Sequence, residues 1–128
     1  VPGNFGEPSH VLLREAMTAP RWRERLSRLI RPGSHEPIDY LDALIAGGLL
    51  AVDVWETTYY HVLTGDDPVF TWVSGTALRP VMAALDATER EAFLEPYAAA
   101  LREAYPPRDD GSVILPFRRI FGVARGSR

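Results

Sequence analysis

At 128 residues, the chain is long enough for one domain with a modest core and too short for two. Its 46% hydrophobic and 24% charged residues are ordinary for a folded protein and argue against disorder. The net charge of −3 argues against a nucleic-acid partner, because contact with phosphates normally needs a surplus of cations.

The residue types that are missing narrow the possibilities further. The absence of cysteine excludes disulfides and thiolate–metal sites and favours a reducing cytoplasm. Three histidines without an i, i+4 pair predict no metal site, and no apolar run approaches the ~20 residues of a membrane span. The N-terminus has neither Met nor the features of a signal peptide, so we expect a piece of a longer protein.

The first half of the chain is predicted to be helical up to one long strand. Ser9 is the expected N-cap of the first helix, and Pro37 and Gly47-Gly48 bracket the third. A run of β-branched and aromatic residues then indicates a strand. The expected helices are residues 9–17, 21–30 and 37–46, and the expected strand is 50–63.

The second half repeats this pattern of helices followed by a strand. Thr88 and Glu91 have the spacing of a capping box, and the helix they begin places one apolar stripe along its length, namely Phe93, Tyr97, Leu101 and Tyr105. Pro116 predicts a bulge or an unpaired position in the last strand. The expected helices are 68–75, 78–85 and 88–105, and the expected strand is 112–125.

The helix of residues 37–49 runs directly into a strand, a pattern similar to the fifth helix and sixth strand of class I S-adenosylmethionine-dependent methyltransferases. Four further blocks of sequence are residues 7–15, 52–61, 72–80 and 111–125. In this order and spacing they resemble the C-terminal portion of the methyltransferases of the trans-aconitate type.

The resemblance implies a fold class and a domain organisation. We expect an α+β fragment in which a helical cap accompanies two long antiparallel strands, the C-terminal part of a class I α/β sheet. Residues 1–128 would form a single C-terminal substrate-cap domain, with cap helices at 9–31 and 68–105. Residues 37–63 would be the helix plus the sixth strand, and 112–125 the seventh.

The resemblance also implies an activity that this chain cannot perform by itself. The parent enzyme would methylate trans-aconitate to its monomethyl ester with S-adenosyl-L-methionine as cofactor. The chain lacks a G-x-G-x-x-G turn and the acidic residue that grips the cofactor ribose, so the cofactor would be bound mainly by the missing N-terminal half. We therefore expect the fragment to be inactive alone, and no catalytic residue is identified.

Five residues are candidates for binding a small polycarboxylate acceptor. Arg79 could clamp a carboxylate or, equally well, tie down a helix end. Tyr59, Tyr60 and His61 fall at the carboxyl end of the sixth strand, where alternation places Tyr60 on the opposite face from the other two. Tyr60 is the favoured contact, although core packing is the commoner role of such a Tyr. His10 could donate to a carboxylate or lie at the surface.

One alternative to the enzyme remains open, a non-catalytic α+β module that binds a ligand or dimerises. The two long strands would expose unpaired edges in a fragment, so self-association as a homodimer is also expected. The sequence leaves the identity of the acceptor open, because a cap of this kind can vary on one fold.

Overall fold

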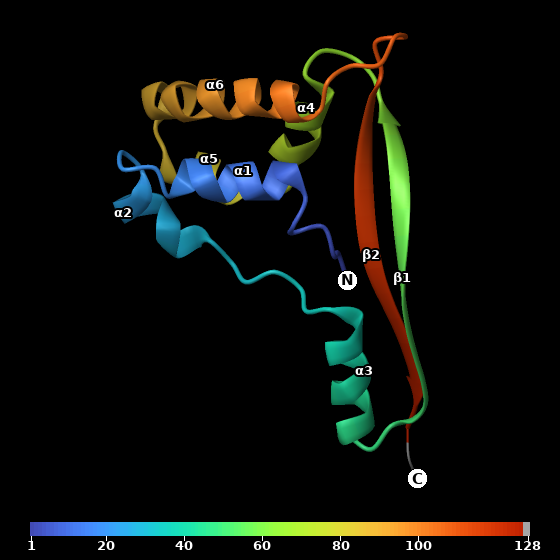
Figure 1. Cartoon of the computed structure of the whole chain (residues 1–128). Helices are drawn as coiled ribbons and strands as arrows, with labels where there is room; N and C mark the ends of the chain where they lie inside the picture. The colour runs from blue at the N-terminus through green and yellow to red at the C-terminus, as the bar shows by residue number, and fades with distance from the viewer. Residues whose placement is uncertain (127–128) are drawn as a thin grey trace. The chain divides into compact units, whose positions relative to one another are not determined.

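The computed structural model describes residues 1–126 and confirms an α+β fragment (Figure 1). Two long strands pair in an antiparallel ribbon, and the other elements are helical. In chain order the elements are α1 (Pro8–Met17), α2 (Arg23–Leu26), the 3-10 helix η1 (Ser27–Leu29), α3 (Pro37–Ala46), β1 (Leu50–Leu63), α4 (Pro68–Ser74), α5 (Arg79–Ala84), α6 (Ala87–Ala104) and β2 (Val113–Arg125).

The chain divides into two compact units. The first, here called the ribbon unit, comprises Val1–Phe5, Gly33–Tyr60 and, of the described residues, 116–126. The second, the helical unit, comprises Gly6–Pro32 and His61–Leu115. That all of these residues form one substrate-cap domain remains a prediction.

The N-terminal residues of the ribbon unit pair with β2 at its free edge. Pro2 forms an antiparallel bridge with Arg119. The amide of Gly3 donates to the carbonyl of Arg118 over 2.8 Å, and the amide of Ile120 donates to the carbonyl of Val1 over 2.8 Å. One edge of β2 is thus paired with β1 and part of the other with residues 1–3, which leaves less of the strand unpaired.

Helix α3 of the ribbon unit is well capped but buries none of its side chains fully. Glu36 and Asp39 form a capping box at its start. At its end Gly48 takes a φ of +81°, and the amide of Leu49 reaches the carbonyl of Leu44, which is the Schellman pattern. Its apolar positions are half-buried or exposed, so the caps, rather than burial in a core, define where the helix begins and ends.

Phe5 and Gly33 meet inside the ribbon unit, although 27 residues (6 to 32) separate them in the sequence. A Cβ atom on Gly33 would lie 2.9 Å from the Phe5 Cβ, so only glycine permits this approach. The chain leaves the ribbon unit after Phe5 and returns to it at Gly33, so the exit and the return lie next to each other.

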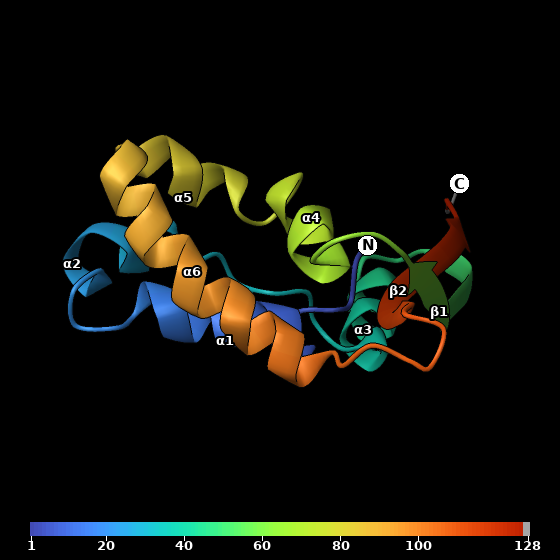
Figure 2. The same cartoon turned by 90° about the horizontal axis from the view of Figure 1, so that it is seen from above.

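The helical unit holds the main hydrophobic core. Helices α1 and α6 lie side by side in both views (Figures 1 and 2), and the predicted apolar stripe of α6 is buried throughout. Trp22 packs edge-on against Phe93, with ring centroids 5.8 Å apart. The core comprises Leu13, Met17, Trp22, Leu26, Val69, Val73, Leu78, Val81, Leu85, Phe93, Tyr97, Leu101, Tyr105, Val113 and Leu115.

Three predicted helix boundaries differ from the structure. Pro8 occupies the first turn of α1, so Glu7 rather than Ser9 is the N-cap. The capping box of α6 is formed by Asp86 and Glu89, two residues earlier than predicted, because both of its reciprocal bonds form there. The predicted helix of residues 21–30 is only the short α2 followed by η1.

Candidate functional site

His10 lies in the first turn of α1, in the helical unit, and is half-buried. Burial, and secondarily the positive charge of Arg14, lowers the pKa of the His10 imidazole below its ordinary value of 6.5. The ring is therefore predominantly neutral at pH 7, and a neutral imidazole offers one N–H donor and one acceptor.

The residue before His10 is fixed by two buried tyrosines. The amide of Ser9 donates to the hydroxyl of Tyr105 over 3.0 Å. The hydroxyl of Tyr97 in turn donates to the carbonyl of Ser9 over 2.8 Å. All three residues are buried, so these bonds form away from water and hold the start of α1 against α6.

Arg79 is the first residue of α5 and is exposed. Its amide donates to the carbonyl of Thr76, which ties the backbone of the preceding turn. Its guanidinium has no hydrogen-bond or ion-pair partner within residues 1–126. The position therefore offers an unneutralised cation in the helical unit, while the backbone is held by other groups.

The three aromatic candidates at the end of β1 lie in different units. His61 belongs to the helical unit, half-buried, with its ring 4.9 Å from that of Trp72 on α4. Tyr59 and Tyr60 belong to the ribbon unit and are exposed, Tyr60 to 68%. The structure therefore places His61 against Trp72, and it groups His61 with His10 and Arg79 in the helical unit.

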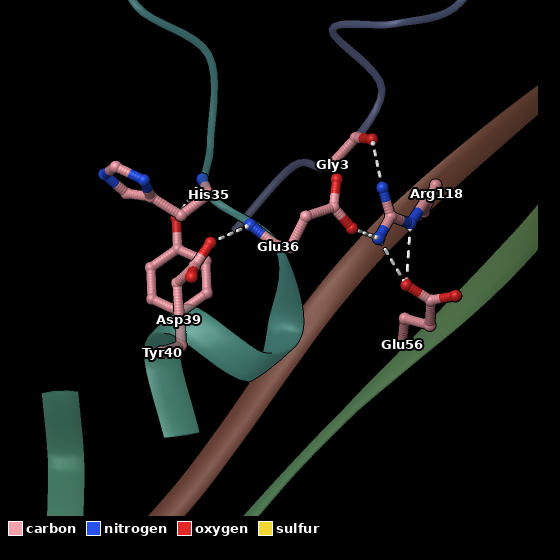
Figure 3. A network of polar contacts seen from close by, with 7 residues as sticks. All are labelled: Gly3, His35, Glu36, Asp39, Tyr40, Glu56 and Arg118. Carbon is pink, nitrogen blue, oxygen red and sulfur yellow. Dashed lines mark hydrogen bonds and ion pairs between the residues drawn. The ribbon is translucent and has the colours of Figure 1, made fainter. Parts of the chain in front are cut away.

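A polar network of the ribbon unit is centred on Arg118 (Figure 3). Its guanidinium binds Glu56 of β1, with Nε 2.8 Å from Oε2, and also Glu36 at the start of α3, over 2.9 Å. A longer contact of 3.5 Å reaches the carbonyl of Gly3. These two carboxylates raise the pKa of Arg118 above its ordinary value. The guanidinium is thus paired with two carboxylates, and the network joins protein segments rather than offering a free cation.

A pocket of about 230 Å³ lies in the helical unit between the loop before α4 and the end of α6. Asp67 and Arg102 in its wall are paired over 2.8 Å. The cationic side chain of the lining is thus already paired, and most of the lining is apolar, so the pocket suits a carboxylate poorly. None of the five predicted acceptor residues lines it.

The hydrogen bonds of Tyr97 and Tyr105 to Ser9 were not predicted from the sequence. Tyr97 and Tyr105 were predicted only as members of an apolar stripe. The one sequence feature that could have indicated their hydrogen bonds is the choice of Tyr over Phe at two positions of the stripe.

Among residues 1–126, no group of three or more His, Cys, Asp or Glu side chains could hold a metal ion. None of the described helices combines the length and apolar character needed to cross a membrane.

Comparison with known proteins confirms the resemblance. The chain is 54% identical to a trans-aconitate 2-methyltransferase of Streptomyces avermitilis over 97% of its own length and 46% of the relative's. It is 53% identical to the Streptomyces coelicolor protein of the same name, over 98% and 42%, and 49% identical to that of Rhodococcus jostii, over 98% and 50%. No family model matches. The chain therefore spans about half the length of these relatives, and the matched half is the C-terminal one.

Proposed function

Since the chain is homologous to the C-terminal half of the trans-aconitate 2-methyltransferases, we propose that it supplies the acceptor-binding part of a carboxyl methyltransferase. In the full-length protein it would help to convert trans-aconitate to its monomethyl ester. The single observation that carries this proposal is identity of about one residue in two along nearly the whole chain. A reducing cytoplasm, favoured by the absence of cysteine, completes the proposal.

The chemistry of the acceptor matches the groups that the helical unit offers. An ionised carboxylate is already a nucleophile near neutral pH, so the protein's task is to orient it. The exposed guanidinium of Arg79 would hold one carboxylate of the acid. The neutral imidazole of His10 can donate one hydrogen bond to a second carboxylate of the acid and adds no further positive charge. His61 of the same unit is a further donor, and Tyr59 and Tyr60, which belong to the ribbon unit, remain candidates from the sequence alone.

The residues of this chain do not by themselves fit S-adenosyl-L-methionine. They lack the Gly-rich turn at which backbone amides approach such a cofactor. We propose that the other half of the full-length protein binds it and that this half binds the acceptor. The 128-residue chain alone would then be inactive.

The direct test is an assay of the full-length protein with S-adenosyl-L-methionine labelled in its methyl group. Trans-aconitate should yield a labelled monomethyl ester, identified by mass spectrometry, at a higher kcat/KM than citrate or cis-aconitate. Absence of a labelled ester with every small polycarboxylic acid would refute the proposal. A much higher kcat/KM with another acid would refute trans-aconitate as the acceptor.

Arg79 can be tested with a matched arginine in the same unit. Arg79→Gln should raise the KM for trans-aconitate roughly tenfold or more, since a charge-assisted hydrogen bond contributes ~1.5–3 kcal/mol. Arg28→Gln removes another exposed arginine, on η1, and should leave KM within about twofold. Equal effects of the two substitutions would remove Arg79 from the proposed site.

A dimerising module is the second candidate function, favoured by the surface of the ribbon unit. Large apolar side chains are exposed there, including Leu50, Trp55, Tyr59, Tyr60 and Val123. Light scattering of the 128-residue chain at rising concentration would show a dimer if this surface self-associates. A strict monomer at high concentration would eliminate this candidate.

A further inference from the structure

We propose that Tyr97 and Tyr105 are positioning residues that fix the first turn of α1 and thereby the imidazole of His10. The two hydroxyls bind opposite ends of the Ser9 residue, its amide and its carbonyl. Where it concerns catalysis, the inference rests on the proposed function. Its structural content concerns residues of the helical unit only and can be tested without an assay of activity.

The hydrogen bond to Tyr105 replaces a cap that the start of α1 lacks. The first amides of a helix have no partner within the helix, and a side chain at the N-cap normally satisfies one of them. At α1 the N-cap is Glu7, whose side chain makes no capping bond. The Ser9 amide instead donates to Tyr105, 96 residues away in the sequence. A distant residue therefore satisfies the amide that the local cap leaves without a partner.

The hydrogen bond from Tyr97 fixes the same residue from its other end. Burial raises the pKa of the Tyr97 hydroxyl well above its usual range, so it remains protonated and continues to donate. The Ser9 carbonyl can accept a second bond, whereas the Ser9 amide has one hydrogen to give. Loss of the Tyr105 hydroxyl should therefore disturb this turn more than loss of the Tyr97 hydroxyl.

His10 follows Ser9 directly, so a displacement of the Ser9 backbone displaces the Cα and the ring of His10. The ring is half-buried, and it is attached to a backbone that the buried bonds at Ser9 hold in place. Displacement of a binding group by about 1 Å can cost on the order of a hundredfold in rate. Two residues that never touch the acceptor would thus affect how it is oriented.

The test uses Tyr105→Phe and Tyr97→Phe in the full-length protein, with Tyr40→Phe as the matched control. The Tyr40 hydroxyl also accepts a backbone amide, that of His35, over 3.1 Å, but at an exposed site in the ribbon unit. Each substitution removes one oxygen and keeps the ring, so differences between the variants report the environment of the hydroxyl.

Two measurements are independent of activity. Tyr105→Phe should accelerate hydrogen exchange of the Ser9 amide about tenfold or more, since a buried donor without an acceptor opens to solvent readily. The ring Cε1–H resonance of His10 should shift in Tyr105→Phe and, less, in Tyr97→Phe, and remain in place in Tyr40→Phe. Unchanged exchange and an unchanged His10 resonance in Tyr105→Phe would overturn the proposal.

A double-mutant cycle with His10→Ala separates positioning from general stability. If Tyr105 acts through His10, Tyr105→Phe should lower kcat/KM about tenfold in the presence of His10 and hardly at all in its absence. An equal loss in both backgrounds would overturn the catalytic part of the inference. If the parent protein transfers no methyl group, the proposed function fails. Hydrogen exchange of the Ser9 amide and the ring resonance of His10 then still decide whether the two tyrosines position His10.

Discussion

The Ser9–Tyr97–Tyr105 cluster of the helical unit and the Arg118 network of the ribbon unit perform similar tasks with different chemistry. Each joins segments that are far apart in the sequence. The tyrosine cluster uses two neutral hydrogen bonds between buried groups. The Arg118 network uses charges, but the side chains of Glu56 and Glu36 are 49% and 68% exposed.

We expect burial to outweigh formal charge in deciding which of the two networks contributes more to stability. Exposed ion pairs contribute about 0–1 kcal/mol, because water already solvates both charges. Removing one partner of a buried hydrogen bond leaves a group that water cannot reach, at a cost of about 1–3 kcal/mol. The neutral cluster should therefore be the more important one for stability, and the following substitutions test that ranking.

The largest expected effect compares the aromatic pairs of the two units. Phe93→Ala removes a ring that is 2% exposed and packs against Trp22, and should lower the free energy of unfolding by about 3–5 kcal/mol. Trp55→Ala removes a ring that stacks on Phe121 but is 41% exposed, and should cost about 1–2 kcal/mol. Urea denaturation measures both, and a larger loss for Trp55→Ala would invert the comparison.

The next effect concerns the buried hydroxyls. Tyr105→Phe should lower the free energy of unfolding by about 1–3 kcal/mol, because the Ser9 amide loses its acceptor while remaining buried. Tyr40→Phe should change it by less than about 0.5 kcal/mol, because the His35 amide is exposed and can bind water. Similar losses in the two variants, measured by the same denaturation, would contradict the role given to burial.

Arg118→Gln should have a smaller effect in spite of its two carboxylate partners. We expect a loss of at most about 1 kcal/mol, since solvent screens Glu36 and Glu56. The difference from the parent protein should shrink further in 1 M salt, where the screening length is about 3 Å. A salt-independent loss of several kcal/mol would place this network with the buried one.

The smallest expected effect comes from the exposed ion pair of Arg25 with Glu89. Arg25, chiefly through its hydrogen bond to the carboxylate, lowers the pKa of Glu89 from 4.5 to about 2. A depressed carboxyl pKa stabilises the fold above pH 4.5 and loses that contribution as the pH falls toward 2. The melting temperatures of the parent and Glu89→Gln should therefore differ slightly at pH 7 and converge near pH 2. A difference that persists unchanged at pH 2 would exclude the ion pair as its cause.

A titration of His10 tests burial on a single ionisable group. Its pKa is lowered mainly by burial, so an NMR titration should give a midpoint below 6.5. Since the unfolded chain takes up the proton at a higher pH, the contribution of His10 to stability declines as the pH falls below 6.5. Arg14→Gln should raise the midpoint only partly, because the charge of Arg14 is the lesser cause. A full return to 6.5 in that variant would show charge, rather than burial, to dominate.

The regular elements could be predicted from the sequence because their signals are local. The run of β-branched and aromatic residues gave the strand Leu50–Leu63, and Pro37 with Gly47-Gly48 gave the third helix. The residues Phe93, Tyr97, Leu101 and Tyr105 were predicted to share one stripe of the helix, and all four are buried. Each of these depends on residues within a few positions of one another, for which side-chain period and turn chemistry are sufficient.

The site could be predicted only as a set of candidates, because its geometry depends on distant residues. Ser9 is of a residue type that is favoured at N-caps, but Pro8 takes the first helical position, so Glu7 is the N-cap. The partner that compensates, Tyr105, lies almost a whole chain length away, and no local pattern links it to Ser9. Likewise, the three consecutive candidates at the end of β1 fall in two units, a division that alternation along a strand does not reveal.

The meeting of Phe5 and Gly33 has a consequence for how such a protein can vary. Because the chain leaves and re-enters the ribbon unit at one point, residues 6–32 form a segment closed at its base by Phe5 and Gly33. Inside this segment Leu13, Met17, Trp22 and Leu26 belong to the core of the helical unit, so the segment can vary between relatives only together with the helices that it packs against. An exchange at Phe5 and Gly33 that carried His10 into another protein would therefore have to carry α6 as well.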